Sequence, residues 1–265
     1  MPFALEALLA YVLPMTANES PAPTVSDPAS FEKPTQEPGK IRAMFSAIAS
    51  RYDLMNHLLS SGIDILWRRR VAREYVTQDQ RHILDLACGT GDLALEMRKR
   101  AHPDCHIYGA DFTGAMLRLA AEKTPASARG SMTWIEGDGL RLPFPDARFD
   151  LLTIGFGIRN MASLDTALGE MYRVLRPGGR LVILEFTTPP NPLVRAVYMP
   201  YFLHVLPRIA ALLSQRSAYL YLGKSVMNFP KAQQLGEKMV AQGFKEVTWR
   251  FLTFGIAAIH MGVRK

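Results

Sequence analysis

Glycine and carboxylate residues cluster in one short segment, LDLACGTGDL, at residues 84–93. Gly89 and Gly91 let the backbone approach a ligand where a Cβ atom would collide with it. Asp85 precedes the two glycines and Asp92 follows them, and this pair of negative charges would repel a pyrophosphate. The same charges suit a cationic ligand, such as a sulfonium that carries an amino-acid tail. The segment therefore favours a sulfonium cofactor over a dinucleotide.

Two later segments agree with this interpretation. Asp111 follows about 20 residues after the glycines, where a carboxylate accepts hydrogen bonds from ribose hydroxyls. The segment EGDGLRLPFPDARFD then offers Asp138 beside a slot the size of adenine. Each feature also has an ordinary alternative, because the glycines could form a tight turn, Asp85 could be a buried acceptor, and Asp92 could cap a helix. An NAD-linked oxidoreductase stays open too, since Ala94 is tolerated at the third position of the GxGxxG fingerprint.

A parallel sheet would bring these residues together. Short apolar runs alternate with helical periods, which predicts parallel strands in a doubly wound α/β sheet. RPGGR, at residues 176–180, is expected to end a helix just before the fifth strand. We expect helices near residues 92–100, 115–123, 164–175 and 231–242, and strands at 82–87, 106–111, 132–136, 150–155, 180–186, 246–252 and 256–263.

Two helical segments outside the sheet are expected to cover its ligand-binding edge. Apolar residues recur with a period of 3.6 from residue 41 to residue 60, which predicts an amphipathic helix. A second helix, with Trp67 and three arginines, follows Gly62, so that residues 41–78 form an N-terminal helical cap. The insertion at residues 187–229 is rich in Pro, Tyr, Leu and Met, and we expect it to form a hydrophobic lid.

The composition allows one globular domain behind a leader. Of 265 residues, 48% are hydrophobic and 21% charged, enough for a sizeable core. Residues 1–40 are expected to be a disordered leader because they have little to bury. Two cysteines and no secretory signal favour the cytoplasm, and no apolar run is long enough for a transmembrane helix. The net charge of +7 favours nucleic acid or acidic lipid as a partner without choosing between them.

Taken together, DLACGTGD, Asp111 and GDGLRLPFPDARFD resemble the class I S-adenosylmethionine-dependent methyltransferases. FGIRN stands where enzymes that methylate exocyclic amines carry Asn/Asp-Pro-Pro-aromatic, so base methylation is disfavoured and we expect no nucleic-acid partner. Residues 41–265 resemble one family in particular, the demethylmenaquinone methyltransferases, also called ubiquinone/menaquinone biosynthesis C-methyltransferases. The resemblance lies in MFSAIASRYDLMNHLLSSGIDILWRR, FGIRN, EMYRVLRPGGRLVILEF and NFP, in that order.

The resemblance implies a Rossmann-like, mostly parallel sheet with an antiparallel C-terminal strand, and S-adenosylmethionine as the cofactor. The methyl acceptor would be a ring carbon of a polyprenylated quinol. Demethylmenaquinol is the first expectation, and the benzoquinol of ubiquinone biosynthesis is the alternative. The implied cofactor-binding residues are Asp85, Gly89, Thr90, Asp111, Asp138 and Gly139.

The resemblance also implies three catalytic residues. Arg159 would stabilise the quinolate or hold a water that takes the proton, Asn160 would orient a ring oxygen, and Tyr52 would lie over the ring. Each has a structural alternative. Arg159 could only pair with a carboxylate, for example Asp165, Asn160 could cap the helix ahead of Leu164, and Tyr52 could be part of the core. The histidines form no cluster at metal-ligand spacing, so we expect no metal.

The substrate's isoprenoid tail needs an apolar channel, which residues 194–213 and the first helix would form. Arg68–Arg70 and Arg195 would then rest on anionic lipid at the inner face of the membrane. The alternative is a buried helical cap with a solvated basic face. Another small-molecule methyltransferase, which acts on oxygen or on a sterol-like carbon, and a non-catalytic quinone-binding protein stay open. The oligomeric state also stays open, a homo-oligomer included.

Overall fold

The computed structural model describes residues 38–60, 62–205, 208 and 216–265, all within the unit Glu32–Lys265. The expected disordered leader, residues 1–40, falls mostly on residues 1–37, which lie outside the described residues. Its last three residues begin the helix α2, Pro38–Leu59. The first helix therefore starts earlier than its apolar period predicts.

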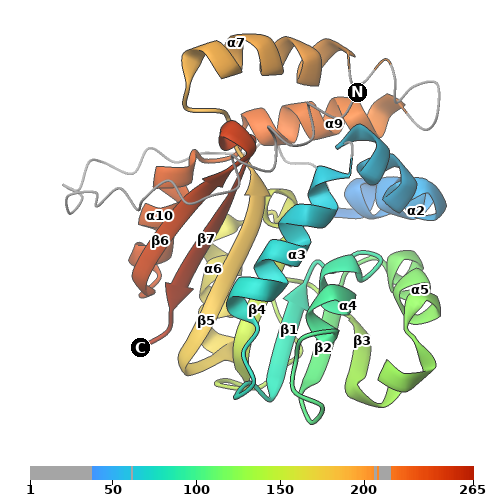
Figure 1. The fold of residues 1–265 in the computed structure, drawn as a ribbon, viewed down its shortest axis with the longest axis vertical. Coiled ribbons are helices and arrows are strands. Elements are labelled where there is room, and N and C mark those ends of the chain that lie inside the picture. The colour runs from blue at the N-terminus through green and yellow to red at the C-terminus, as the bar shows by residue number, and fades with distance from the viewer. Residues whose placement is uncertain (1–37, 61, 206–207, 209–215) are drawn as a thin grey trace, which may run out of the picture. The chain divides into compact units, whose positions relative to one another are not determined.

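One seven-stranded sheet forms the centre of the described residues (Figure 1). Its strand order is β3-β2-β1-β4-β5-β7-β6. The first five strands pair in parallel, whereas β7 is antiparallel to both of its neighbours, β5 and β6. The predicted doubly wound sheet with an antiparallel C-terminal strand is confirmed. The strands are β1 (His82–Leu86), β2 (His106–Asp111), β3 (Met132–Glu136), β4 (Phe149–Gly155), β5 (Leu175–Phe186), β6 (Lys245–Leu252) and β7 (Ala257–Val263).

Helices cover both faces of the sheet and one of its ends (Figure 1). Side chains cap the N-termini of two helices. The hydroxyl of Ser163 accepts a hydrogen bond from the amide of Thr166 at the start of α6 (Leu164–Val174), and the side chain of Asn191 caps α7 (Pro192–Pro200) in the same way. The remaining helices are α3 (Ile63–Tyr75), α4 (Asp92–Arg98), α5 (Gly114–Lys123), α9 (Arg216–Met227) and α10 (Ala232–Ala241), with short turns η1 (Ala126–Ser131), η2 (Ile158–Asn160), η3 (Tyr201–Val205, a π-helix) and η4 (Thr253–Gly255).

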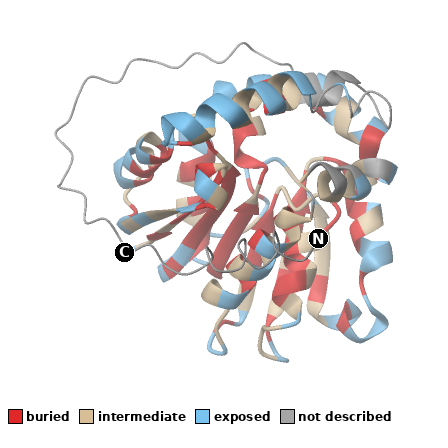
Figure 2. Ribbon diagram, turned by 45° about the horizontal axis from the view of Figure 1, so that its top comes forward, coloured by how far each residue is buried: buried red, intermediate tan, exposed pale blue. Residues whose placement is uncertain are grey.

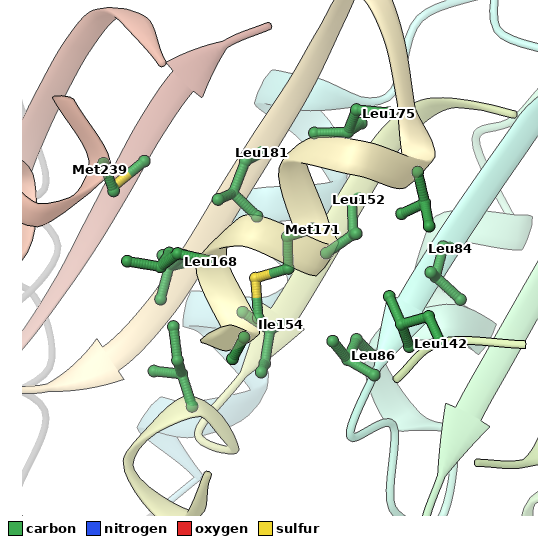
Figure 3. Close-up of a cluster of buried hydrophobic side chains, with 14 of the residues drawn as sticks. Leu84, Leu86, Leu142, Leu152, Ile154, Leu168, Met171, Leu175, Leu181 and Met239 are labelled. Atoms are coloured by element: carbon green, nitrogen blue, oxygen red, sulfur yellow. The ribbon is translucent and has the colours of Figure 1, made fainter. Parts of the chain in front are cut away.

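The central strands are buried on both faces, as Figure 2 shows. Leu84 and Leu86 of β1 point into a core shared with β4, β5, α6 and α10 (Figure 3). Ile83, the residue before Leu84, points to the other face and packs with Trp67 of α3 and Met97 of α4. Burial on both faces explains why the strands read as nearly continuous apolar runs.

The segment RPGGR does not separate helix from strand as predicted. Helix α6 does end at Val174, but β5 begins at once, at Leu175 rather than at Arg180. Leu175 pairs with Phe149 and Arg180 pairs with Leu151, so the residues between them form an irregularity inside the strand. Gly178, with φ of 80°, supplies the left-handed conformation there.

Within residues 38–60, 62–205, 208 and 216–265, no helix combines the length and the apolar character needed to cross a bilayer. The same part of the chain holds no group of three or more His, Cys, Asp or Glu side chains that could bind a metal ion.

Candidate active site

The predicted site residues gather at one edge of the sheet, where the carboxyl ends of the parallel strands meet. The glycine turn follows β1, Asp111 ends β2, Asp138 follows β3 and Arg159 follows β4. Helices α2, α7 and α9 lie together beyond this edge (Figure 1). Ligands of open α/β sheets bind in this position.

The glycines shape the turn after β1. Gly89 and Gly91 have φ of 55° and 82°, in the left-handed region that glycine tolerates best. A Cβ at Gly91 would lie 2.6 Å from Cη2 of Trp134, so close packing requires glycine there. Among the described residues, a Cβ at Gly89 would meet only Cε1 of Tyr52, at 3.9 Å. Gly89 therefore lies next to Tyr52 of helix α2, with no side chain of its own between the backbone and that ring.

Asp85 is a buried carboxylic acid inside β1. Its Oδ1 accepts a hydrogen bond of 2.7 Å from the hydroxyl of Thr153 on β4. Its Oδ2 is buried and has no hydrogen-bond partner among the described residues. Burial raises the pKa of Asp85 to about 7. The side chain is therefore costly to ionise unless a cationic ligand comes near.

Asp111 holds the turn together from the end of β2. Its Oδ2 accepts a hydrogen bond of 2.9 Å from the amide of Gly89, and its Oδ1 accepts one of 2.8 Å from the amide of Thr113. Burial raises the pKa of this carboxyl group. Each oxygen keeps a further lone pair, so the predicted role on a ribose stays compatible with these bonds.

Thr90, Lys123, Asp53 and Asp92 form a cluster that we call the Lys123 cluster. The hydroxyl of Thr90 donates to Oδ1 of Asp53 at 2.5 Å. Nζ of Lys123 lies 2.9 Å from Oδ2 of Asp53 and also bonds Asp92. The cluster thus joins α2, α4 and α5. Asp92 is thus paired with Lys123, whereas Oδ2 of Asp85, the other carboxylate that suggested a cationic ligand, has no hydrogen-bond partner among the described residues.

Asp138 and Gly139 follow β3 and differ in exposure. Asp138 is exposed, and its Oδ1 accepts a hydrogen bond of 2.9 Å from the amide of Leu140. Gly139 is buried, and a Cβ there would lie 2.7 Å from Cε of Met161. The two residues form a tight turn at the sheet edge, next to the loop after β4.

A cavity of about 360 Å³ lies above this edge, between the N-terminal helices and the insertion. This size falls within the range of small-molecule sites. Its walls are mainly aromatic and aliphatic, with a few polar groups. The lining residues are Met44, Phe45, Ile48, Tyr52, Asn56, Ser60, Ile63, Asp64, Trp67, Arg68, Phe156, Arg159, Phe186, Tyr198, Tyr201, Phe202, Tyr221, Leu222, Thr253 and Ile256.

Arg159 lines the cavity and is buried within a dense network. Its Nη1 donates to Oε1 of Glu185 at 2.7 Å and also to the carbonyl oxygen of Phe156. Its Nε donates to the hydroxyl of Ser225 on α9 at 3.3 Å, and its guanidinium lies 5.7 Å from the ring centroid of Phe186. The guanidinium is thereby held in one orientation at the cavity wall.

The structural alternative for Arg159 is that it pairs with a carboxylate, and it does so, but with another partner than the one suggested. The alternative for Asn160, that it caps α6, is wrong. The carboxylate that pairs with Arg159 is Glu185 rather than Asp165, which lies 2.9 Å from Lys238. The cap of α6 is Ser163 rather than Asn160. Asn160 does not line the cavity, but its Oδ1 accepts a hydrogen bond of 3.0 Å from the hydroxyl of Tyr221, which does.

Tyr52 joins the cavity to the glycine turn. Its ring packs edge-on against Phe45, with centroids 6.0 Å apart, and its Cε1 faces Gly89. Burial raises the pKa of its phenol, and the positive charge of Arg159 acts in the opposite direction. The phenol therefore stays protonated near neutral pH and can donate a hydrogen bond into the cavity.

Three residues that were not expected from the sequence hold the catalytic candidates in place: Glu185, Ser225 and Tyr221. Glu185 did carry a signal, because it is a single acid in the otherwise apolar run LVILEF and is buried in the structure. Ser225 and Tyr221 lie on α9, more than one element away, and no local pattern marks them.

The three consecutive arginines of α3 do not form a solvated basic face. Arg68 pairs with Asp64 and stacks over Phe156, with its Cζ 5.5 Å from the ring centroid. Arg70 pairs with Glu74 at 2.8 Å. Of the three, Arg69 is the exposed one, which weakens the expectation that this triplet rests on lipid.

Solved structures share this fold at low sequence identity. A SAM-dependent methyltransferase of Thermotoga maritima, described as a possible histamine N-methyltransferase, aligns with a TM-score of 0.60 at 18% identity, over 85% of this chain and 100% of its own. Phosphoethanolamine N-methyltransferase 2 of Haemonchus contortus, in complex with S-adenosyl-L-methionine, aligns with a TM-score of 0.54 at 15% identity, over 73% of this chain and 51% of its own. These likenesses confirm the class I methyltransferase fold.

Curated relatives are much more similar in sequence. Demethylmenaquinone methyltransferase of Deinococcus radiodurans is 49% identical over 85% of this chain and 92% of its own. The enzyme of the same name from Thermus thermophilus is 52% identical over 83% of this chain and 100% of its own. Ubiquinone/menaquinone biosynthesis C-methyltransferase UbiE of Geobacter sulfurreducens is 44% identical over 86% and 90%. Since the pattern of the ubiE/COQ5 methyltransferase family also matches residues 33–264, the chain belongs to that family.

Proposed function

We propose that this enzyme transfers a methyl group from S-adenosylmethionine to a ring carbon of a prenylated quinol. The observation that carries the proposal is an aromatic cavity that contains Arg159 and Tyr52 and adjoins the glycine turn. Family membership and the names of the relatives support the same reaction.

The residues around the turn fit S-adenosylmethionine. The unpartnered Oδ2 of Asp85 suits an ammonium group, and Gly89, which has no side chain, suits a ligand that runs close to the backbone. Asp111 would accept hydrogen bonds from the ribose, and Asp138 with Gly139 would lie beside the adenine. When bound, this cofactor supplies an electrophilic methyl group on a sulfonium.

Thr90 would contribute mainly through its backbone, because its hydroxyl already donates to Asp53. Its side chain then acts on the site indirectly, since the bond to Asp53 holds α2 against the turn. Helix α2 in turn carries Tyr52 and helps to exclude water from the cavity.

Arg159 supplies positive charge where the quinol becomes an anion. A ring carbon becomes nucleophilic when the adjacent hydroxyl group loses its proton, and a fixed cation stabilises the oxygen anion that forms. A guanidinium stays charged across the physiological pH range. Glu185, which bonds Nη1 of Arg159, fixes the direction of that charge. We therefore assign Arg159 the stabilisation of the quinolate oxygen.

Tyr52 and Asn160 would orient the ring in different ways. Tyr52 lines the cavity as a protonated phenol and can donate to a ring oxygen directly. Asn160 acts through Tyr221, whose hydroxyl it holds by a hydrogen bond. Asn160 is therefore a positioning residue in this proposal, and Tyr221 is the group that faces the substrate.

The prenyl tail would leave the ring cavity along the insertion. Tyr198, Tyr201 and Phe202 of α7 and η3 line the cavity, and the predicted channel segment, residues 194–213, includes all three. The remainder of that segment falls partly on residues 206–207 and 209–215, which lie outside the described residues. A substrate with such a tail resides in a bilayer, so the enzyme would work at a membrane surface.

A naphthoquinol is the preferred acceptor. The relatives named demethylmenaquinone methyltransferase are 49% and 52% identical to this chain, whereas four UbiE relatives from Geobacter and Geotalea are 44% to 45% identical. The benzoquinol of ubiquinone biosynthesis is the second candidate, since the latter names include both quinones.

The decisive experiment uses purified protein, labelled S-adenosylmethionine and two reduced short-chain quinols, demethylmenaquinol and its benzoquinol counterpart. We expect label on the naphthoquinol ring, with slower or no transfer to the benzoquinol. Faster transfer to the benzoquinol would reverse the preference, and no transfer to either ring would overturn the proposed function.

A further inference from the structure

The outer surface of the insertion carries an apolar stripe. Leu193, Val197, Tyr201 and Val205 recur at every fourth residue through α7 and η3, and their exposed fractions are 78%, 78%, 39% and 44%. Side chains at this spacing lie along one side of a helix. Most of α7 is coloured as exposed in Figure 2, and no residue within it is buried. The stripe is therefore a continuous apolar face turned to solvent.

The opposite side of the same segment is built differently. Tyr198 and Phe202 stack with ring centroids 5.4 Å apart, and Phe202 is buried in a cluster with Ile48 of α2 and Val226 of α9. This layer is thus one helix thick, with aromatic residues toward the substrate cavity and aliphatic residues toward solvent. Soluble helices normally turn a polar face outward.

The Lys, Arg, Asp and Glu residues of the insertion are all of one sign. Residues 187–229 contain four basic residues and neither Asp nor Glu; the four are Arg195, Arg208, Arg216 and Lys224. Arg195 and Lys224 are exposed on α7 and α9. An insertion that combines an apolar stripe with cations and contains no acid complements a bilayer, which is apolar inside and anionic at its head groups.

The stripe also reaches the cavity. Tyr201 belongs to the exposed stripe and at the same time lines the cavity that holds Arg159. A path of apolar side chains therefore leads from the outer surface to the site without crossing a charged residue of the insertion. This continuity is what a substrate with a hydrocarbon tail requires.

We propose that the outer face of α7 and η3 docks on an anionic phospholipid bilayer and admits the prenyl tail past Tyr201. This inference rests on the proposed function, because it assumes a prenylated acceptor. It moves the lipid contact from Arg68–Arg70 to the insertion. A second copy of the chain fits this face poorly, since an isologous contact would bring together two insertions that contain cations and no acids.

The test compares two double variants, each of which replaces one exposed leucine and one exposed valine by serine. Leu193→Ser with Val197→Ser removes one leucine and one valine from the stripe. Leu66→Ser with Val240→Ser removes the same pair from α3 and α10, where these side chains are also exposed. Flotation with vesicles of phosphatidylcholine and phosphatidylglycerol should fall about tenfold or more for the stripe variant. It should stay within twofold for the control.

Two further measurements separate the possible failures. Turnover of a water-dispersed short-chain quinol should be unchanged in the stripe variant, whereas turnover of a long-chain quinol in vesicles should fall with flotation. Arg195→Gln should weaken flotation on anionic vesicles and leave weak binding to pure phosphatidylcholine unchanged.

Equal flotation of both double variants would overturn the proposed docking face. A stripe variant that changes the sedimentation coefficient of the protein, and hence its self-association, but not its flotation would overturn it as well. If the unmodified enzyme did not methylate the short-chain quinol at all, the proposed function itself would be refuted.

Discussion

Asp85, which we propose binds the cofactor, opposes the stability of the ligand-free protein. Its pKa is raised by burial to about 7, from 3.8 in a free chain. Between these two pH values the folded protein binds more protons than the unfolded chain, so stability falls as the pH rises through this window. A cation bound near Oδ2 would remove that penalty, which couples the ligand to the fold.

We therefore expect Asp85→Asn to stabilise the ligand-free protein at pH 8, by on the order of 2 kcal/mol, and to have little effect at pH 4. Urea unfolding between these pH values measures the difference. Calorimetry with S-adenosylhomocysteine should show binding weakened about tenfold, since one tenfold step corresponds to about 1.4 kcal/mol. A stability difference that does not change with pH would contradict the assignment.

Substitution of Arg159 tests its proposed role in turnover separately from cofactor binding. Arg159→Ala should change S-adenosylhomocysteine affinity by no more than about twofold and slow turnover about 100-fold or more. The reason is that the variant lacks the fixed positive charge that would stabilise the quinolate oxygen. Arg148→Ala is the matched control, since Arg148 is exposed and stacks on Tyr108 away from the cavity. Turnover retained in Arg159→Ala, or lost equally in both variants, would remove Arg159 from the mechanism.

The Lys123 cluster acts at the scale of elements. It joins α2 to α4 and α5 through one ammonium group that lies close to both Asp53 and Asp92. The lysine side chain is 33% exposed, so the contribution to global stability is expected to be about 1 kcal/mol or less. Its main effect is on how firmly α2 is held over the glycine turn.

Lys123→Met should therefore speed amide hydrogen exchange in α2 about fivefold and shift the melting temperature little. Lys99→Met is the matched control, because Lys99, at the end of α4, pairs at 2.6 Å with Glu96 of that helix and forms no ion pair with another element among the described residues. Exchange in α2 that is equal in the two variants would show that packing alone holds this helix.

Most elements could be predicted from the sequence because their patterns are local. Six of the seven strands begin within about one residue of their expected positions, since apolar runs end where burial ends. The start of β5 could not be predicted, because Leu175 belongs to the sheet through its pairing with Phe149, which is a contact between distant residues. The same holds for Glu185 and Ser225, whose importance appears only when Arg159 is placed between them.

The expected N-terminal leader leads to a prediction about the extent of the folded domain. The family pattern begins at residue 33 and the first described helix at Pro38. We expect a chain that starts at residue 33 to keep its melting temperature within about 2 °C and its turnover of a short-chain quinol. A loss of stability in the shortened chain would show that residues 1–32 belong to the folded domain.

Strand order has a consequence for how the enzyme is made. β5 ends at Phe186, yet one of its two edges is covered by β7, which begins at Ala257. While the ribosome adds the intervening residues, β5 offers unpaired amides and carbonyls, and the apolar insertion emerges during the same interval. The nascent chain thus passes through a stage in which an open strand edge and an apolar segment are exposed together. We expect the yield of folded enzyme to depend on how quickly translation reaches β7.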